Sequence, residues 1–138
     1  MNKLGDLSCN EFLTELASAA PAPGGGGGAA MAGALAAALA SMVANLTIGK
    51  EKFADREPEV KELLEQAEAE RVRLLTLVDE DAAVFNSFMS CYKLPKTTDE
   101  EKAARTAAIR AAAKQAATVP LNIARSSFAV LKLADRLV

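Results

Sequence analysis

The sequence predicts an all-α protein, and three observations support this fold class. Half of the 138 residues are hydrophobic, and much of that share is alanine, which has the highest helix propensity of any residue. The chain contains no tryptophan and one tyrosine, so the aromatic and β-branched runs typical of strands are scarce. Apolar residues recur at steps of three and four over long segments, as in amphipathic helices. We therefore expect one domain, residues 1–138, built as an up-and-down bundle of long helices.

The first expected helix covers residues 9–19. It carries a short apolar stripe and ends before Pro21, because the residue preceding a proline disfavours helix. The second expected helix begins in five consecutive glycines, residues 24–28, and continues to Ile48, with Gly49 as its C-terminal cap. Small residues at every fourth position of this helix would admit another helix at close range, for which we expect a second copy of the chain. They are Ala29, Gly33, Ala37, Ser41 and Asn45.

The glycine run is the most informative local feature of the chain. Glycine lets a ligand or a neighbouring backbone approach without a Cβ in the way. At the start of a helix, such a run presents free backbone N–H groups and the positive end of the helix dipole to an anion. The alternative is a flexible linker, but linkers mix serine and charge with glycine and do not continue directly into a strong helix. The pattern favours a binding loop.

The third expected helix, residues 58–92, has one apolar stripe over many turns. Asp81 falls three residues after Val78 and four before Phe85, so it projects from the middle of that stripe, whereas Asp79 and Glu80 point toward solvent. A carboxylate on a buried face costs free energy unless it is paired, hydrogen-bonded or protonated. Asp81 is therefore a candidate for proton transfer, or a structural aspartate satisfied by a neighbouring helix end or by an arginine such as Arg71.

The fourth expected helix follows a break at residues 94–96. Thr98 and Glu101 have the spacing of a capping box, and we expect helix from residue 99 to residue 117. Pro120 should kink or end this helix, and a last helical piece should reach Leu137.

Composition excludes several classes of function. The formal charge of −2 and the isoelectric point near 5.2 give no basic surface for nucleic acid. The absence of histidine excludes serine or cysteine triads of the usual kind and histidine metal sites. Cys9 and Cys91 have no metal-site spacing, which fits free thiols in a reducing cytoplasm.

No export signal is visible at the N-terminus, since acidic residues stand where a basic and apolar run would be. Residues 29–48 carry no charge and are long enough to span a bilayer. However, alanine is only weakly apolar, and the polar residues in this segment, Ser41, Asn45 and Thr47, oppose insertion. We therefore expect a buried helix and no membrane partner.

Four segments, in order along the chain, resemble the formimidoyltetrahydrofolate cyclodeaminase family, which includes bacterial methenyltetrahydrofolate cyclohydrolases. They are ASAAPAPGGGGGAAMAGALAAALASMVANLTIGKEKF at residues 17–53, LVDEDAAVF at residues 77–85, LPKTTDEEKAAR at residues 94–105 and TVPLNIA at residues 118–124. The resemblance implies an all-helical intertwined homodimer that acts on the C–N bonds of 5-formimino- or 5,10-methenyltetrahydrofolate, with the tetrahydrofolate derivative as substrate and no metal.

The resemblance also implies site residues. Asp81 matches the proton acceptor of the family, and the glycine loop of the family matches Pro23, Gly24, Gly25 and Gly26. The next position is usually serine in the family and is Gly27 here. Lys50 and Lys52 match the G-K-x-K-[FY] stretch, and we assign them to the anionic glutamate tail of folate, since such a substrate requires cations. Alternatively, Lys50 and Lys52 are ordinary surface lysines at a helix C-terminus, where the helix dipole favours a positive charge.

The resemblance has a limit at the C-terminal end. Family members continue with a loop containing G-N and S-D and with further helices, which are not found after Leu131. We therefore expect a single cyclodeaminase-like domain that lacks the C-terminal helices of the family. The alternative from another class is a non-catalytic helical dimerisation module derived from this family.

Overall fold

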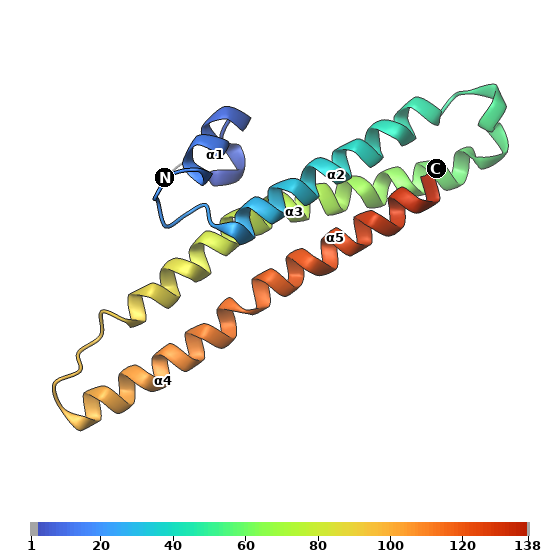
Figure 1. The fold of residues 1–138 in the computed structure, drawn as a ribbon. Helices are drawn as coiled ribbons and strands as arrows, with labels where there is room; N and C mark the ends of the chain where they lie inside the picture. The colour runs from blue at the N-terminus through green and yellow to red at the C-terminus, as the bar shows by residue number, and fades with distance from the viewer. Residues whose placement is uncertain (1–2, 138) are drawn as a thin grey trace.

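The computed structural model describes residues 3–137, and within this range every regular element is a helix (Figure 1). The elements, in chain order, are η1 Leu4–Asp6, α1 Cys9–Leu16, α2 Gly25–Thr47, η2 Glu51–Arg56, α3 Glu57–Cys91, α4 Asp99–Ala116 and α5 Thr118–Leu137. The all-α prediction is confirmed. The bounds of the long helices agree closely with the expected ones, and the largest difference is that α1 ends at Leu16 instead of Ala19.

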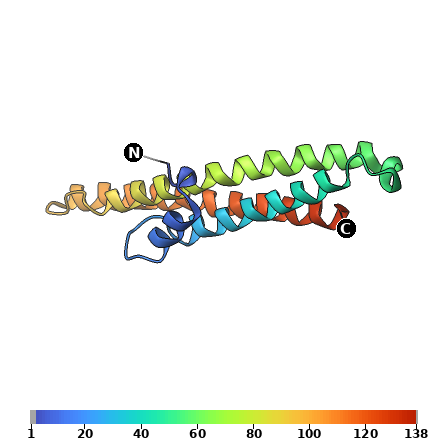
Figure 2. The same ribbon diagram turned by 90° about the horizontal axis from the view of Figure 1, so that it is seen from above.

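Helices α2, α3 and α5 form a three-helix bundle, in which α3 runs antiparallel to both neighbours (Figure 1). The view from above shows an elongated molecule with α1 beside the start of α2 (Figure 2). The largest fully buried side chains are Phe12 from α1 and three apolar residues of α3, namely Leu63, Leu74 and Val78. The apolar stripe of α3 is thus the centre of the core, as its periodicity predicts.

The small residues of α2 face the bundle of the same chain. A Cβ added at Gly33 would come within 2.9 Å of the Ser127 hydroxyl oxygen and 3.1 Å of a Leu74 methyl group. The absence of side chains here lets α3 and α5 approach α2 closely. Our expectation that this face receives a second copy is therefore wrong for Gly33, Ala37 and Ser41, which are buried within the chain.

One polar contact lies inside this packing. The Ser41 hydroxyl donates a hydrogen bond of 2.7 Å to Glu68 on α3, and Arg71 forms an ion pair of 2.7 Å with the same carboxylate. Hydrogen bonds from Arg71 and then from Ser41 lower the pKa of Glu68 to about 2. Ser41, which belongs to the small-residue face of α2, therefore has a hydrogen-bond partner where α2 packs against α3.

The helix ends follow local rules. Thr98 and Glu101 form the predicted capping box at α4, and Ser8 with Glu11 forms a second one at α1. Gly49 adopts a positive φ of 76° after α2, which is the predicted C-terminal cap. Pro120 is the third residue of α5. The backbone N–H groups in the first turn of a helix have no hydrogen-bond partner within the helix, so a proline there removes no such bond.

The end of α3 and the whole of α4 extend beyond the bundle as a two-helix hairpin (Figure 1). No residue of α4 is buried. The chain reverses direction between Tyr92 and Thr98, and Arg105 of α4 donates a hydrogen bond of 3.3 Å to the carbonyl oxygen of Tyr92. The site described below lies where this hairpin leaves the bundle.

Within residues 3–137, α2 is the one helix whose length and composition would allow it to cross a membrane, a criterion that core helices of soluble proteins also meet. One face of α2 is packed against α3 and α5 and holds the hydrogen bond between Ser41 and Glu68.

Candidate functional site

The first turn of α2 meets Asp81, which lies in the C-terminal half of α3. The backbone N–H of Gly27 donates a hydrogen bond of 2.9 Å to Oδ2 of Asp81. The residue before the helix, Gly24, has no side chain that could cap it, so the carboxylate from α3 accepts from one of the free N–H groups of this turn. The positive end of the α2 dipole also faces the carboxylate, which favours a negative charge at this place.

Gly26 makes this contact possible. A Cβ on Gly26 would overlap all three atoms of the Asp81 carboxyl group, whereas a Cβ on the neighbouring Gly25 would meet nothing within 4 Å. The glycine run is therefore used for a close approach between a backbone and a carboxylate. The sequence predicted an anion at this turn, and the anion is supplied by the protein itself.

Asp81 also lines a cavity of about 360 Å³. Within residues 3–137, Oδ1 of Asp81 accepts no hydrogen bond. Asp81 itself is half-buried. One oxygen is therefore held by the backbone, and the other is not held by a hydrogen bond from the described residues.

The cavity is bounded by three parts of the chain. They are the turn before α2, the C-terminal half of α3, and the junction of α4 with α5. The lining residues are Pro21, Ala22, Gly24, Gly25, Gly26, Asp81, Ala82, Val84, Phe85, Ala116 and Pro120. The lining is apolar apart from one carboxylate and the glycine backbone, a composition typical of small-molecule sites. No cation is present in it.

The two structural alternatives for Asp81 can now be separated. Arg71 does not contact Asp81, because its guanidinium pairs with Glu68. A helix end does satisfy Asp81, through Gly27. This contact uses one oxygen, so it holds the carboxylate in place and leaves the other oxygen without a hydrogen bond from the described residues.

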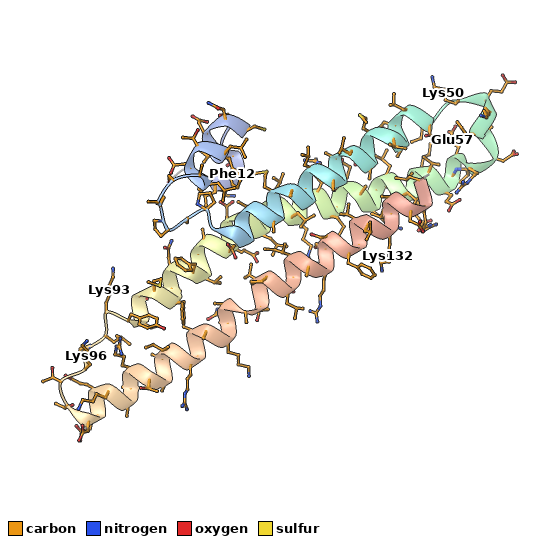
Figure 3. All side chains as sticks on the ribbon, in the orientation of Figure 1. Phe12, Lys50, Glu57, Lys93, Lys96 and Lys132 are labelled. Carbon is orange, nitrogen blue, oxygen red and sulfur yellow. The ribbon has the colours of Figure 1, made fainter. Side chains whose placement is uncertain are left out.

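The predicted site residues fall into two groups. Gly24, Gly25, Gly26 and Asp81 meet at the cavity, whereas Pro23 and Gly27 are buried directly beneath the turn. Lys50 and Lys52 lie beyond the other end of α2, and both are exposed. Figure 3 shows Lys50 beside Glu57, at the opposite end of the bundle from Phe12.

The 23 residues of α2 separate the lysines from the glycine turn. At a rise of about 1.5 Å per residue, this helix is roughly 34 Å long. The expected site, with glycines, aspartate and lysines together, is therefore not formed within one chain.

One expectation about α3 is wrong. Asp79 does not point into solvent: its Oδ1 accepts a hydrogen bond of 2.7 Å from the backbone N–H of Leu4. It thereby holds the 3-10 helix η1 against α3. The expectation for Glu80 is confirmed, since its side chain is exposed.

Sequence reasoning missed several residues of the cavity. The helical period places Phe85 on the apolar stripe of α3, but Phe85 also lines the cavity and is 38% exposed. The sequence predicts Pro120 as a helix breaker, and this residue also lines the cavity. The segment TVPLNIA contains this proline and was a usable signal. Ala22 and Ala116 carry no chemical signal that could have indicated a site.

Within residues 3–137, no group of three or more cysteine, aspartate or glutamate side chains is placed to hold a metal ion. Cys9 and Cys91 are both free thiols.

Comparisons with known proteins identify the family of this chain. Residues 8–138 match the family described as formiminotransferase-cyclodeaminase. A methenyltetrahydrofolate cyclohydrolase of Methylorubrum extorquens is 49% identical over 131 residues, which are 95% of this chain and 63% of that protein. A formimidoyltransferase-cyclodeaminase of Rattus norvegicus is 40% identical over 88% of this chain and 22% of that protein.

A solved structure shares the fold. The crystal structure of formiminotetrahydrofolate cyclodeaminase from Thermotoga maritima superposes with a TM-score of 0.64 at 28% identity, over 99% of this chain and 78% of that one. The chain thus spans less than two thirds of the length of the cyclohydrolase and less than a quarter of the rat protein. With the family match over nearly its whole length, the chain belongs to the formiminotransferase-cyclodeaminase family.

Proposed function

We propose that this protein is a folate-dependent one-carbon enzyme that hydrolyses 5,10-methenyltetrahydrofolate to 10-formyltetrahydrofolate, with Asp81 as the proton acceptor. The observation that carries the proposal is the position of Asp81: its Oδ2 is fixed by the N–H of Gly27, and its carboxyl group lines an otherwise apolar cavity. The relative at 49% identity, a methenyltetrahydrofolate cyclohydrolase, supports this reaction.

The reaction requires one group that moves protons. Asp81 removes a proton from water as the water oxygen adds to the methenyl carbon, which gives a tetrahedral carbon bonded to N5, N10 and a hydroxyl group. Asp81 then gives this proton to N5 as the bond between that carbon and N5 breaks. The hydroxyl proton leaves to solvent, and the formyl group remains on N10.

A second candidate reaction is cyclodeamination of 5-formiminotetrahydrofolate. It is favoured by the rat relative and by the solved cyclodeaminase structure. N10 would attack the formimino carbon, and Asp81 would move the N10 proton to the formimino nitrogen. A second proton from solvent would let ammonia leave, and the methenyl bridge would remain. Both reactions pass through a tetrahedral carbon bonded to N5 and N10, which carries a hydroxyl group in one reaction and an amino group in the other, so one carboxylate can serve either.

The cavity fits the flat end of a folate. The ring of Phe85 offers an apolar surface against which a pterin can stack. The glycine turn has no side chains and lets that ring approach the backbone. The alternative of a non-catalytic dimerisation module is not favoured, because the relatives at 49% and 40% identity are a methenyltetrahydrofolate cyclohydrolase and a formimidoyltransferase-cyclodeaminase.

Two further features belong to this proposal. The protein acts as a homodimer, which would cover the large apolar side chains that α2 exposes. It is located in the cytoplasm, where its free cysteines would stay reduced. Sedimentation of the purified protein and fractionation of its native cells test these two statements.

The test of the reaction is an absorbance assay of the purified protein with each folate in turn. Loss of the methenyl chromophore indicates cyclohydrolysis, and its appearance from 5-formiminotetrahydrofolate indicates cyclodeamination. Asp81→Asn should lower kcat by about 10²- to 10⁴-fold. The matched control is Asp79→Asn, which alters a half-buried carboxylate on the same helix that contacts Leu4 and not the cavity. Equal activity of the two variants would remove Asp81 from the mechanism.

A further inference from the structure

The junction of α4 and α5 interrupts the hydrogen-bond pattern of a helix beside the cavity. Helix α4 ends at Ala116 and α5 begins at Thr118 (Figure 1). Ala117 between them keeps helical angles, with φ −69° and ψ −19°, so the backbone passes from one helix into the next without a loop. In such a backbone, the N–H of each residue donates to the carbonyl four residues before it. Residue 120 is proline and has no N–H, so the carbonyl of Ala116 has lost its usual donor.

Other carbonyls at this end of α4 do have donors. The N–H of Ala117 donates a hydrogen bond of 3.1 Å to the carbonyl of Ala113. The hydroxyl of Thr118 donates one of 3.5 Å to the carbonyl of Lys114. Among the turn and cap hydrogen bonds of the described part of the chain, none is accepted by the carbonyl of Ala116. Ala116 is half-buried, so a partner for its carbonyl comes from solvent or from a molecule in the cavity.

This carbonyl lies on the side of the junction that faces the cavity. A helical carbonyl points along the axis toward the residue four places on, so the oxygen of Ala116 lies between Ala116 and Pro120. Residues four apart share one face of a helix, and these two residues both line the cavity. Helix α3 contributes Asp81 and Phe85, which are also four apart, to the same cavity. A carboxylate from α3 and a backbone carbonyl from the junction therefore border one cavity.

A carbonyl oxygen is a hydrogen-bond acceptor only, so it selects a ligand that has a donor. The ring of a reduced pterin has such donors in its 2-amino group, its N3–H and its N8–H. We propose that the carbonyl oxygen of Ala116, left without its helical donor by Pro120, accepts a hydrogen bond from an N–H group of the pterin and positions the ring beside Asp81. This inference rests on the proposed function and adds a binding group to its site.

Two replacements of Pro120 separate the carbonyl from the proline ring. Pro120→Ala restores an N–H that can donate to the carbonyl of Ala116. Lactic acid at residue 120, introduced by nonsense suppression, has the same methyl side chain but an ester oxygen in place of the N–H, so it leaves that carbonyl free. Both replacements remove the ring, and they differ only at this atom. Their comparison therefore isolates the hydrogen bond.

The KM for 5,10-methenyltetrahydrofolate should be about tenfold higher in Pro120→Ala than in the lactic acid variant, which is the effect of losing one hydrogen bond to the ligand. The two values of kcat should be similar, because Asp81 lies on another helix. Pro120→Ala should also unfold at a higher urea concentration, since the restored bond joins α4 to α5. Equal KM values overturn the inference, whether or not the unfolding midpoints differ.

Equilibrium binding tests the ligand side without turnover. The probes are 5-formyltetrahydrofolate and three analogues that each lose one donor: one with methyl in place of the 2-amino group, one methylated at N3, and one with carbon in place of N8. Calorimetry should show that one analogue binds the wild-type protein about tenfold more weakly than the parent folate does, and that Pro120→Ala lacks this difference. Losses that are equal in the two proteins for all three analogues overturn the inference.

The results also separate this inference from the proposed reaction. Turnover by the wild-type protein, with equal KM values for the two replacements, leaves the reaction standing and removes the role of the Ala116 carbonyl. Binding that depends on residue 120, without turnover of either folate, supports the carbonyl as a binding group and contradicts the proposed reaction. Absence of both binding and turnover overturns both.

Discussion

The contact between Gly26 and Asp81 allows a sharp test with two neighbouring alanine substitutions. Gly25→Ala and Gly26→Ala each add one methyl group to the first turn of α2. Both gain helix propensity, worth at most about 1 kcal/mol per residue. A methyl group at Gly25 meets nothing within 4 Å, whereas one at Gly26 overlaps the Asp81 carboxyl group. The pair therefore isolates the effect of that overlap.

The expected magnitude follows from the hydrogen bond that is lost. To admit the methyl group of Gly26→Ala, Asp81 must move and give up its 2.9 Å bond from Gly27. A hydrogen bond to a charged group contributes about 1.5–3 kcal/mol. We expect Gly26→Ala to be less stable than Gly25→Ala by this amount, because the gain in helix propensity cancels between them.

Urea unfolding at one fixed protein concentration measures this difference, and the absorbance assay measures its effect on turnover. Gly25→Ala should unfold at the wild-type urea concentration or slightly above it and should keep its fold and its Asp81 position. Gly26→Ala should unfold earlier and lose at least tenfold in kcat, since the displaced carboxylate no longer faces the cavity in the same way. Equal stability and equal kcat of the two variants would refute the account of the glycine run as a close approach to Asp81.

Two other predictions concern the scaffold. Because hydrogen bonds from Arg71 lower the pKa of Glu68 to about 2, the charged form of Glu68 stabilises the folded state above about pH 4.5, and this contribution is lost as the pH falls toward 2. Thermal unfolding from pH 7 to pH 2 should therefore show a shallower acid decline for Glu68→Gln than for the exposed control Glu65→Gln, and identical declines would contradict the assignment. Leu74→Ala should cost about 2–5 kcal/mol of unfolding free energy in denaturant titrations, because Leu74 is fully buried. Leu35→Ala, on the exposed face of α2, should lower the unfolding free energy far less. A similar loss of unfolding free energy in both variants would mean that α2 buries the face that carries Leu35.

The helices could be predicted because their signals are local. The capping box at Thr98 and the cap at Gly49 act through neighbouring residues, and they are present where expected. The period of the apolar residues in α3 also identified which face is buried, and this places Asp81 toward α2. The orientation of the small residues of α2 was not predictable in the same way. Small residues permit close packing with any helix, and the sequence does not state which chain supplies that helix.

The composition of the cavity depends on tertiary contacts that no local pattern describes. Phe85 and Pro120 have ordinary roles in their own helices, as an apolar stripe residue and a first-turn proline. They become neighbours only because the junction of α4 and α5 lies opposite the C-terminal half of α3. The hydrogen bond between the Leu4 N–H and Asp79 joins residues that are 75 positions apart. The position of Asp79 in the helical period of α3 therefore could not reveal this bond.

The separation of the lysines from the glycines was, in contrast, implied by the sequence itself. A single unbroken helix of 23 residues joins the two motifs, and a helix has a fixed rise per residue. A function that uses both motifs at one site therefore requires either a second chain or a different role for one of them. Because α2 is this long, any mechanism that uses both motifs at one site depends on how many copies of the chain associate.

Gly27 shows how a departure from the family pattern can be judged once the structure is known. A side chain at this position would start 3.4 Å from Pro23 and 3.8 Å from Val78, which are ordinary contacts. A serine would thus fit, but its Cβ would point into the protein beneath the turn and not into the cavity. The group that the site takes from residue 27 is its backbone N–H, which holds Asp81 in place. Because glycine supplies that N–H as well as serine does, the substitution preserves the contact on which the proposed chemistry depends.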